Sequence, residues 1–320
     1  MKDLRIIFMG TPDFAVAGLQ KLVENNFNIV GVITAPDRPA GRGQKIQQSA
    51  VKTYAQSQDL NILQPTNLKD DAFLGQLKAL KANLQIVVAF RMLPQVVWQM
   101  PEYGTFNLHA SLLPDYRGAA PINWAIIKGE TETGVSTFFI DEKIDTGAII
   151  FQEKLSIAAD ESAGILHDRL MHLGSDLILK TVKHIEKGDV TTTIQSKQEQ
   201  LHTAYKLNRD NTRINWSASV NDIHNLIRGL SPYPVAYTIF SNGDDKEHQL
   251  KIYQALKPSN DDLPLVSTEA GKILVNNGKL FIATQDSWIE LIEIQLSGKK
   301  KMLVKDLLNG FTFDEDAKML

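Results

Sequence analysis

The feature that most constrains this chain is an alternation of short apolar runs with helical patterns in its first hundred residues. Residues 4–9 (LRIIFM) end at Gly10, and Pro12 and Asp13 then open a helical spacing of apolar residues. Residues 29–34 and 84–90 form two further apolar runs typical of buried strands. This β-α-β order predicts an α/β fold with a Rossmann-like, mostly parallel sheet and helices on both faces. In open sheets of this kind, ligands bind beyond the carboxyl ends of the strands.

Later segments extend this sheet and then change character. Residues 104–110 predict another strand, 134–157 a hairpin with its turn at 142–147, and 162–185 a long helix stopped by Gly188. Residues 189–206 are polar and predict a linker. Beyond them, short strand-like runs separated by Gly, Asn or Asp predict a small β-barrel. We therefore expect a first domain at 1–188, a linker at 189–206 and a second domain at 207–320.

Composition excludes several classes of function. The chain contains no cysteine, which excludes disulfide scaffolds, thiolate nucleophiles and cysteine-based zinc sites. Its net charge of −3 argues against a protein that binds nucleic acid over its whole surface, although a local basic patch remains open. No window approaches about 18 uncharged apolar residues, and Asp3 and Arg5 interrupt any secretory leader. We expect a cytoplasmic protein without membrane attachment.

The residues best suited to chemistry follow a late strand. Asn107 and His109 are two residues apart, so on a strand their side chains share one face. An isolated pair of this kind is more often structural, but here it runs into the turn-rich stretch 111–118 (SLLPDYRG), which suits a ligand pocket. Asp145, in the turn Asp-Thr-Gly, is the natural carboxylate partner, although Asp before Gly is also ordinary turn chemistry. The seven histidines show no metal-binding spacing, so we expect no metal.

Two basic segments have competing explanations. Arg38, Arg42 and Lys45 lie in a Pro- and Gly-rich segment, 36–45, directly after the second predicted strand. A second cluster, Lys299, Lys300 and Lys301, follows Gly298. Each segment is compatible either with a solvated surface or with contacts to phosphates.

Four motifs in this order resemble the methionyl-tRNA formyltransferases, within the folate-dependent formyltransferase family. They are GTPDFA at 10–15, PDRPAGRGQK at 36–45, FNLHASLLPDYRGAAPI at 106–122 and DTG at 145–147. The third is shared by folate-dependent formyltransferases in general, whereas the second is typical of those acting on tRNA. The resemblance covers nearly the whole chain.

The resemblance implies a formyl transfer from 10-formyltetrahydrofolate to the α-amine of methionine on initiator tRNA. It implies an OB-like C-terminal domain and a catalytic trio of Asn107, His109 and Asp145. Basic residues 38, 42 and 45 are expected at the tRNA acceptor end, with 299–301 as a further contact. The residues implied at the folate site are Ser111, Leu112, Leu113, Pro114, Phe90, Met92 and Ile140.

The chain departs from the family at one place. Family members commonly carry a Tyr-Gly-containing stretch after the third strand, whereas this chain has Phe-Arg-Met-Leu at 90–93 and is one residue shorter there. Phosphate loops and dinucleotide glycine motifs are absent, so neither ATP nor NAD is implied.

Two other functions remain open. A folate-dependent formyltransferase acting on an amino sugar or another small amine would use the same trio. A catalytically silent RNA-binding protein would leave that trio without a purpose. We expect a monomer.

Overall fold

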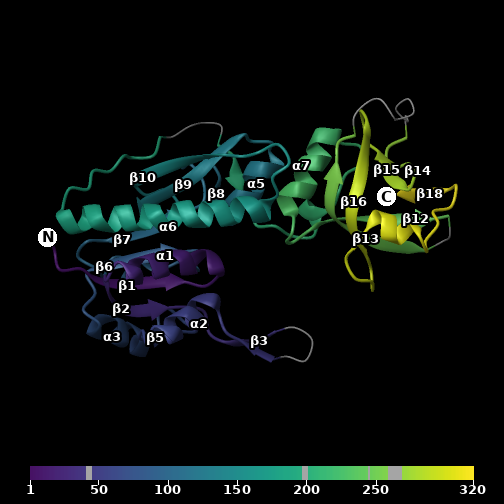
Figure 1. Ribbon diagram of the computed structural model, residues 1–320. Helices are drawn as coiled ribbons and strands as arrows, with labels where there is room; N and C mark the ends of the chain where they lie inside the picture. The colour runs from purple at the N-terminus through teal and green to yellow at the C-terminus, as the bar shows by residue number, and fades with distance from the viewer. Residues whose placement is uncertain (41–44, 197–200, 244–245, 259–268) are drawn as a thin grey trace. The chain divides into compact units, whose positions relative to one another are not determined.

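The computed structural model describes residues 1–40, 45–196, 201–243, 246–258 and 269–320 (Figure 1). The chain divides into two compact units. The first comprises Met1–Gly118, Glu132–Ser156 and His167–Thr203, and the second comprises Ala119–Thr131, Ile157–Leu166 and Ala204–Leu320. The second unit thus includes two segments from within the first 188 residues. The domain boundaries expected from the sequence remain a prediction.

The first unit is built around a seven-stranded sheet in the order β10-β9-β7-β6-β1-β2-β5. Five of its strands are parallel neighbours: β1 (Arg5–Gly10), β2 (Asn28–Ile33), β5 (Ile62–Leu63), β6 (Leu84–Val88) and β7 (Thr105–His109). The hairpin β9 (Glu132–Phe139) and β10 (Ile149–Ser156) continues the sheet in antiparallel register beside β7. The mostly parallel sheet and the hairpin predicted from the sequence are confirmed.

Helices cover both faces of this sheet because side chains of a strand alternate between them. On one face, Ile7 and Met9 of β1 pack into a cluster with residues of α3 (Asp71–Ala79) and α4 (Gln95–Trp98). On the other face, Phe8 lies close to Gly18 of α1 (Asp13–Glu24). A Cβ atom at Gly18 would lie 2.5 Å from Ile178 of α6 (Ala163–Lys187), so α1 and α6 pack closely, side by side in Figure 1.

The long helix α6 matches the predicted helix at 162–185. Gly188 follows it with φ +79°, and the Gly188 N–H donates to the His184 carbonyl at 3.0 Å. This left-handed residue ends the helix as the sequence predicted. The other elements between β2 and α6 are β3 (Arg38–Ala40), β4 (Lys45–Gln47), α2 (Ala50–Ser57), β8 (Arg117–Gly118) and α5 (Pro121–Ile127).

The second unit contains an antiparallel sheet in the order β14-β15-β16-β13-β12-β18, with β17 paired to β16. Its strands are β12 (Ala236–Asn242), β13 (Glu247–Leu256), β14 (Ile273–Asn276), β15 (Lys279–Ala283), β16 (Trp288–Leu296), β17 (Met302–Leu303) and β18 (Ala317–Met319). The short strand-like runs predicted here, at 237–240, 250–253, 272–275, 280–283 and 288–294, fall on β12 to β16. Among the described residues, no ladder joins the end strands β14 and β18; an isolated bridge links Lys272, just before β14, to Lys318 of β18. The expected OB-like barrel is therefore not closed.

This unit also contains α5 and two helices that follow α6, none of which the sequence analysis predicted. The two later helices are α7 (Val220–Leu230) and α8 (Val304–Leu308), and a short β11 (Thr203–Ala204) and a 3-10 turn (Asp210–Thr212) precede them. Ile223, Ile227 and Leu230 of α7 are buried in one core with the sheet. That apolar spacing of three and four residues explains why α7 forms as an amphipathic helix.

Candidate active site

The carboxyl ends of the parallel strands meet at one edge of the sheet. Gly10 ends β1 opposite Val88 of β6, and β6 pairs in turn with β7, which ends at His109. A Cβ atom at Gly10 would lie 2.6 Å from that of Ala15, so only glycine allows this tight turn into α1. The segments predicted to form the site therefore leave the sheet at the same edge.

Asn107 and His109 share a face of β7, as predicted. Leu108 faces α6, because a Cβ atom at Gly174 would lie 2.7 Å from its side chain. Thr105 faces the other way, since its hydroxyl donates to the Trp98 carbonyl at the end of α4 at 2.7 Å. Asn107 and His109 are two and four residues after Thr105, so their side chains project from the same face of β7 as Thr105. Asn107 is half-buried, whereas His109 is only 6% exposed.

The His109 ring has a fixed partner on one nitrogen. Its Nε2 lies 2.9 Å from the backbone carbonyl of Tyr116, an acceptor, so Nε2 carries a proton and donates it. Its Nδ1 lies 3.8 Å from Oδ2 of Asp145, which is an ion-pair distance when the ring is charged but too long for a hydrogen bond. The same oxygen of Asp145 accepts a hydrogen bond from the Gly118 N–H at 3.0 Å.

The Asp-Thr-Gly turn is tightly packed. Asp145 has φ +56°, in the left-handed region where a residue with a side chain is uncommon. A Cβ atom at Gly147 would lie 1.7 Å from the Phe139 carbonyl oxygen, so glycine is required there. Thr146 donates its hydroxyl to Asp141 at 2.7 Å on the exposed side of the turn.

Segment 111–114 is held by one buried hydroxyl. Ser136 of β9 donates to the Ser111 carbonyl at 2.6 Å and accepts the Leu113 N–H at 3.1 Å. Gln152 of β10 donates to the same hydroxyl at 2.8 Å and to the Leu113 carbonyl at 2.9 Å. All hydrogen-bonding positions of the Ser136 hydroxyl are thus used. Of the predicted folate residues here, Ser111 and Leu113 are buried, and Leu112 and Pro114 are half-buried.

The other three predicted folate residues, named the apolar rim, are Phe90, Met92 and Ile140. Phe90 and Ile140 are half-buried and pack against the cluster that includes Leu93, whereas Met92 is 71% exposed. Phe90 and Met92 follow β6 at the carboxyl edge, whereas Ile140 lies beside the start of β7, where its N–H donates to the Thr105 carbonyl at 2.8 Å.

Arg91, within the departure at 90–93, has a structural role. Its guanidinium donates to the carbonyls of Thr66, at 2.9 Å, and Pro65. Burial, and then the charge of Arg38, lower the pKa of Arg91 below its ordinary value. The loops after β5 and β6 are therefore joined by a cation near the predicted site.

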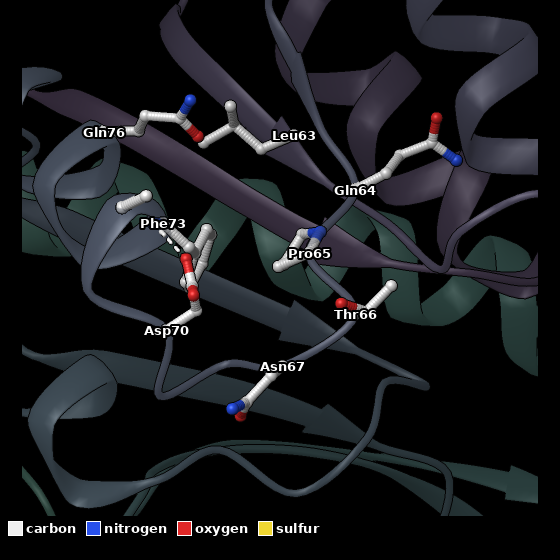
Figure 2. Close-up of a pocket in the computed structure, with 9 residues that line it drawn as sticks. Leu63, Gln64, Pro65, Thr66, Asn67, Asp70, Phe73 and Gln76 are labelled. Carbon is white, nitrogen blue, oxygen red and sulfur yellow. Dashed lines mark hydrogen bonds between the residues drawn. The ribbon is translucent and has the colours of Figure 1, made fainter.

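A cavity of about 310 Å³ lies between the end of β5 and α3 (Figure 2). Its wall includes Pro65 and Thr66, and the Asp70 carboxylate accepts the Phe73 N–H at 3.0 Å to cap α3. None of the site residues predicted from the sequence lines this cavity.

The basic segment begins as a short ribbon. The sequence analysis predicted no strand in this Pro- and Gly-rich segment, but β3 pairs with β4 in antiparallel register. Asp37, at its base, accepts hydrogen bonds from Lys52 and Gln64, which lower the pKa of this carboxyl group. Arg38 is exposed. Arg42 and the Lys45 side chain fall outside the described part of the structure, although the Lys45 backbone begins β4.

The second basic cluster lies between β16 and β17 in the second unit. Lys299 and Lys300 are exposed. Lys301 binds Glu293 at 3.0 Å and lies 5.0 Å from the centre of the Tyr253 ring. Lys299 and Lys300 are thus better placed than Lys301 to meet a phosphate.

Sequence reasoning missed residues that support the site. Ser136 and Gln152 hold segment 111–114, and Gln195 hydrogen bonds to the backbone of the Asp-Thr-Gly turn. Ser136 is not distinguishable by its residue type, because Glu132, Thr133 and Thr137 in the same strand are also polar. Gln195 lies in the polar stretch taken as a linker, where no local pattern marks it.

Within the described ranges, no group of three or more His, Asp or Glu side chains is placed to bind a metal ion. The expectation of no metal stays a prediction. Among the same residues, no helix has the length and apolar character needed to cross a bilayer.

The fold is that of N-formyltransferases. An N-formyltransferase from Helicobacter canadensis, solved with folinic acid and dTDP-3-aminofucose, aligns with a TM-score of 0.64 at 19% identity over 93% of this chain and all of that chain. HypX from Aquifex aeolicus, solved with tetrahydrofolic acid, aligns with a TM-score of 0.65 at 17% identity over 96% of this chain and 47% of its own length.

This chain belongs to the formyl transferase family. The formyl transferase model matches residues 4–182, and the model for the formyl transferase C-terminal domain matches 206–312. The methionyl-tRNA formyltransferase of Flavobacterium johnsoniae is 58% identical over the full length of both chains. That of Bacteroides fragilis is 50% identical over 99% of this chain and 98% of its own.

Proposed function

We propose that this chain transfers the formyl group of 10-formyltetrahydrofolate to the α-amine of methionine on initiator tRNA. The proposal rests on full-length identity of 58% and 50% to two relatives named for this reaction. The site is consistent with it, since His109 ends β7 at the carboxyl edge, where such folds bind ligands, and Asn107 lies two residues before it. The Asp145 carboxylate lies 3.8 Å from the His109 ring.

Asn107 is assigned to the developing oxyanion. When an amine attacks a formyl carbon, negative charge develops on the formyl oxygen, and the folate carrier supplies the activated formyl group. The half-buried amide of Asn107 is a donor on the face of β7 that carries the site. Removing such a donor costs about 100- to 1,000-fold in kcat, so Asn107→Ala should lose that much turnover while still binding folate.

His109 is assigned to proton handling through Nδ1. Because Nε2 donates to the Tyr116 carbonyl, Nδ1 is the nitrogen left for chemistry. A cationic ring directs its Nδ1–H toward the site, and Asp145 at 3.8 Å attracts that charge without taking the proton in a hydrogen bond. The ring can donate the Nδ1 proton to the formyl oxygen, after which the neutral Nδ1 can accept the proton that the amine releases. The attacking α-amine has an ordinary pKa near 8, so it needs no strong base.

The folate carrier is assigned to the apolar rim and to segment 111–114. Phe90, Met92 and Ile140 would contact the heterocycle, and the backbone held by Ser136 would border it. The segment comprises Ser111, Leu112, Leu113 and Pro114.

The tRNA is assigned to the two basic segments. Arg38, Arg42 and Lys45 follow β2 in the sequence, and Lys299, Lys300 and Lys301 form the second proposed contact. Arg42→Ala should weaken the use of tRNA and leave folate binding unchanged. Equal losses in both would count against this assignment.

The catalytic domain is proposed at 1–188, the linker at 189–206 and the OB-like, tRNA-contacting domain at 207–320. The two family models support this division, since they end at residue 182 and begin at 206. We also propose a cytoplasmic monomer. Limited proteolysis tests the domain division, and size-exclusion chromatography tests the monomer.

The decisive experiment follows labelled formyl from 10-formyltetrahydrofolate to three acceptors: charged initiator tRNA, free methionine and a dTDP-amino sugar. His109→Ala is the inactive control. We expect transfer to the tRNA ester alone, abolished in the variant. Transfer to the sugar would favour the alternative, which the fold likeness to the sugar enzyme supports. Folate binding excludes a catalytically silent RNA-binding protein, and its absence would refute the proposal.

A further inference from the structure

The side chain of Gln195 makes four hydrogen bonds beside the candidate site. Gln195 is only 7% exposed. Its Nε2 donates to the carbonyls of Asp145, at 2.9 Å, and Gly147, at 2.8 Å. Its Oε1 accepts from Arg117, at 3.2 Å from Nε and 2.6 Å from Nη2. These partners fix the orientation of the amide, because carbonyls require the N–H groups and a guanidinium requires the oxygen.

Both carbonyls belong to the Asp-Thr-Gly turn. The Asp145 carbonyl belongs to the peptide unit directly after the Asp145 Cα atom, and the Gly147 carbonyl lies two peptide units further on. The Asp145 backbone is in the left-handed region at φ +56°. Thr146 ties the exposed side of the turn to Asp141, so Gln195 supplies the tie on the buried side. Such backbone conformations persist only when the surroundings hold them.

We propose that Gln195 is a positioning residue that holds the turn so that the Asp145 carboxylate faces His109. The inference rests on the proposed function, because it assigns Gln195 to the same site. The Gln195 amide also ties this turn to Arg117, next to the Gly118 N–H that binds the Asp145 carboxylate. Asp145 is therefore fixed through its backbone and its carboxylate by neighbouring parts of one network.

A purely structural role for Gln195 is testable because its segment has another anchor. Thr193 and Ile149 exchange two backbone hydrogen bonds of 2.8 Å. Loss of the Gln195 side chain leaves that anchor intact. Its removal should thus free the turn more than it detaches the segment.

The test compares Gln195→Ala and Gln195→Glu with two control variants. Glutamate keeps an acceptor for Arg117 but places a carboxylate oxygen against two carbonyls, so it separates the contact with Arg117 from the contact with the turn. Ile194→Ala changes the next residue, which is 86% exposed. Asn83→Ala removes a comparable bridging amide, which accepts from the Arg5 N–H and donates to the Asp3 carbonyl, away from the site.

We expect kcat for formyl transfer to fall about 10- to 100-fold in Gln195→Ala, because a shift of about 1 Å in a catalytic group can cost about 100-fold. The KM for folate should change less than about twofold, since that segment is held separately by Ser136. Gln195→Glu should be no better than the alanine variant. Hydrogen exchange should be faster in the turn at 141–148. Both controls should match the wild type in all three readouts.

Each contrary outcome is distinguishable. Absence of formyl transfer by the wild type refutes the proposed function. Faster hydrogen exchange in the turn of Gln195→Ala would still support the positioning role of Gln195. A wild-type kcat in Gln195→Ala, or a loss of thermal stability alone, overturns the inference. Recovery of activity in Gln195→Glu also overturns it, since the contact with Arg117 would then be sufficient.

Discussion

Replacement of Gly147 by alanine is the sharpest test of how the turn positions Asp145. The new Cβ would lie 1.7 Å from the Phe139 oxygen, and ordinary contact begins at 3.4 Å, so the two must separate by about 1.7 Å. The obstacle is backbone in the β9 strand and cannot rotate away. The turn should move instead and carry Asp145 with it.

The expected cost follows from that displacement. Overpacking of this kind costs about 1 to 3 kcal/mol, or roughly 2 to 12 °C in Tm for a unit of this size. Misplacement of the carboxylate by about 1 Å or more should lower kcat about 100-fold. Thermal unfolding and single-turnover formyl transfer at saturating substrates measure the two effects separately.

Gly75→Ala is the matched control. Gly75 lies exposed on α3, and a Cβ atom there would meet nothing within 4 Å. The helix should gain up to about 1 kcal/mol from the lower backbone entropy of the unfolded chain. Gly147→Ala with wild-type kcat and Tm would refute the reasoning, because the turn could then absorb the new carbon without moving Asp145.

Two further predictions concern polar groups buried in each unit. Ser136→Ala should lower the free energy of unfolding by about 1 to 3 kcal/mol and raise the KM for folate, because it leaves the Leu113 N–H without its partner. The exposed Ser57→Ala is the control for both measurements, and an unchanged KM would contradict the role of Ser136. Burial, followed by the charges of Lys257 and Arg228, lowers the pKa of His224, so the folded chain resists its protonation. The unfolded chain takes up that proton near pH 6.5, so this contribution to stability is complete above that pH and falls as the pH drops below it. His224→Leu should therefore lose less stability than the wild type between pH 7.5 and 5.5 in urea unfolding, with the exposed His172→Asn as control; parallel losses in wild type and His224→Leu would contradict this.

Local patterns were sufficient to predict much of the fold. Apolar runs of six or seven residues predicted four of the five parallel strands, and helical spacing up to Gly188 predicted α6, because both signals are local in the chain. Strand β5 was not predicted, because it has only two residues. Helix α7 was not predicted, although its apolar residues recur at helical spacing, because the second domain was predicted from its strand-like runs alone. Strands β3 and β4 in the basic segment after β2 were not predicted either, because strands of three residues have no sequence signal of their own.

For the site, the sequence determined the chemistry that is available, and the tertiary structure decided its geometry. The absence of cysteine, the shared face of Asn107 and His109 and the four motifs are local properties of the chain. The nitrogen of His109 left for chemistry depends on the Tyr116 carbonyl, and the direction of Asp145 depends on contacts from residue 195, which is 50 positions away. Hydrogen bonds between distant segments are set by how the whole chain packs, and no spacing within one segment encodes them.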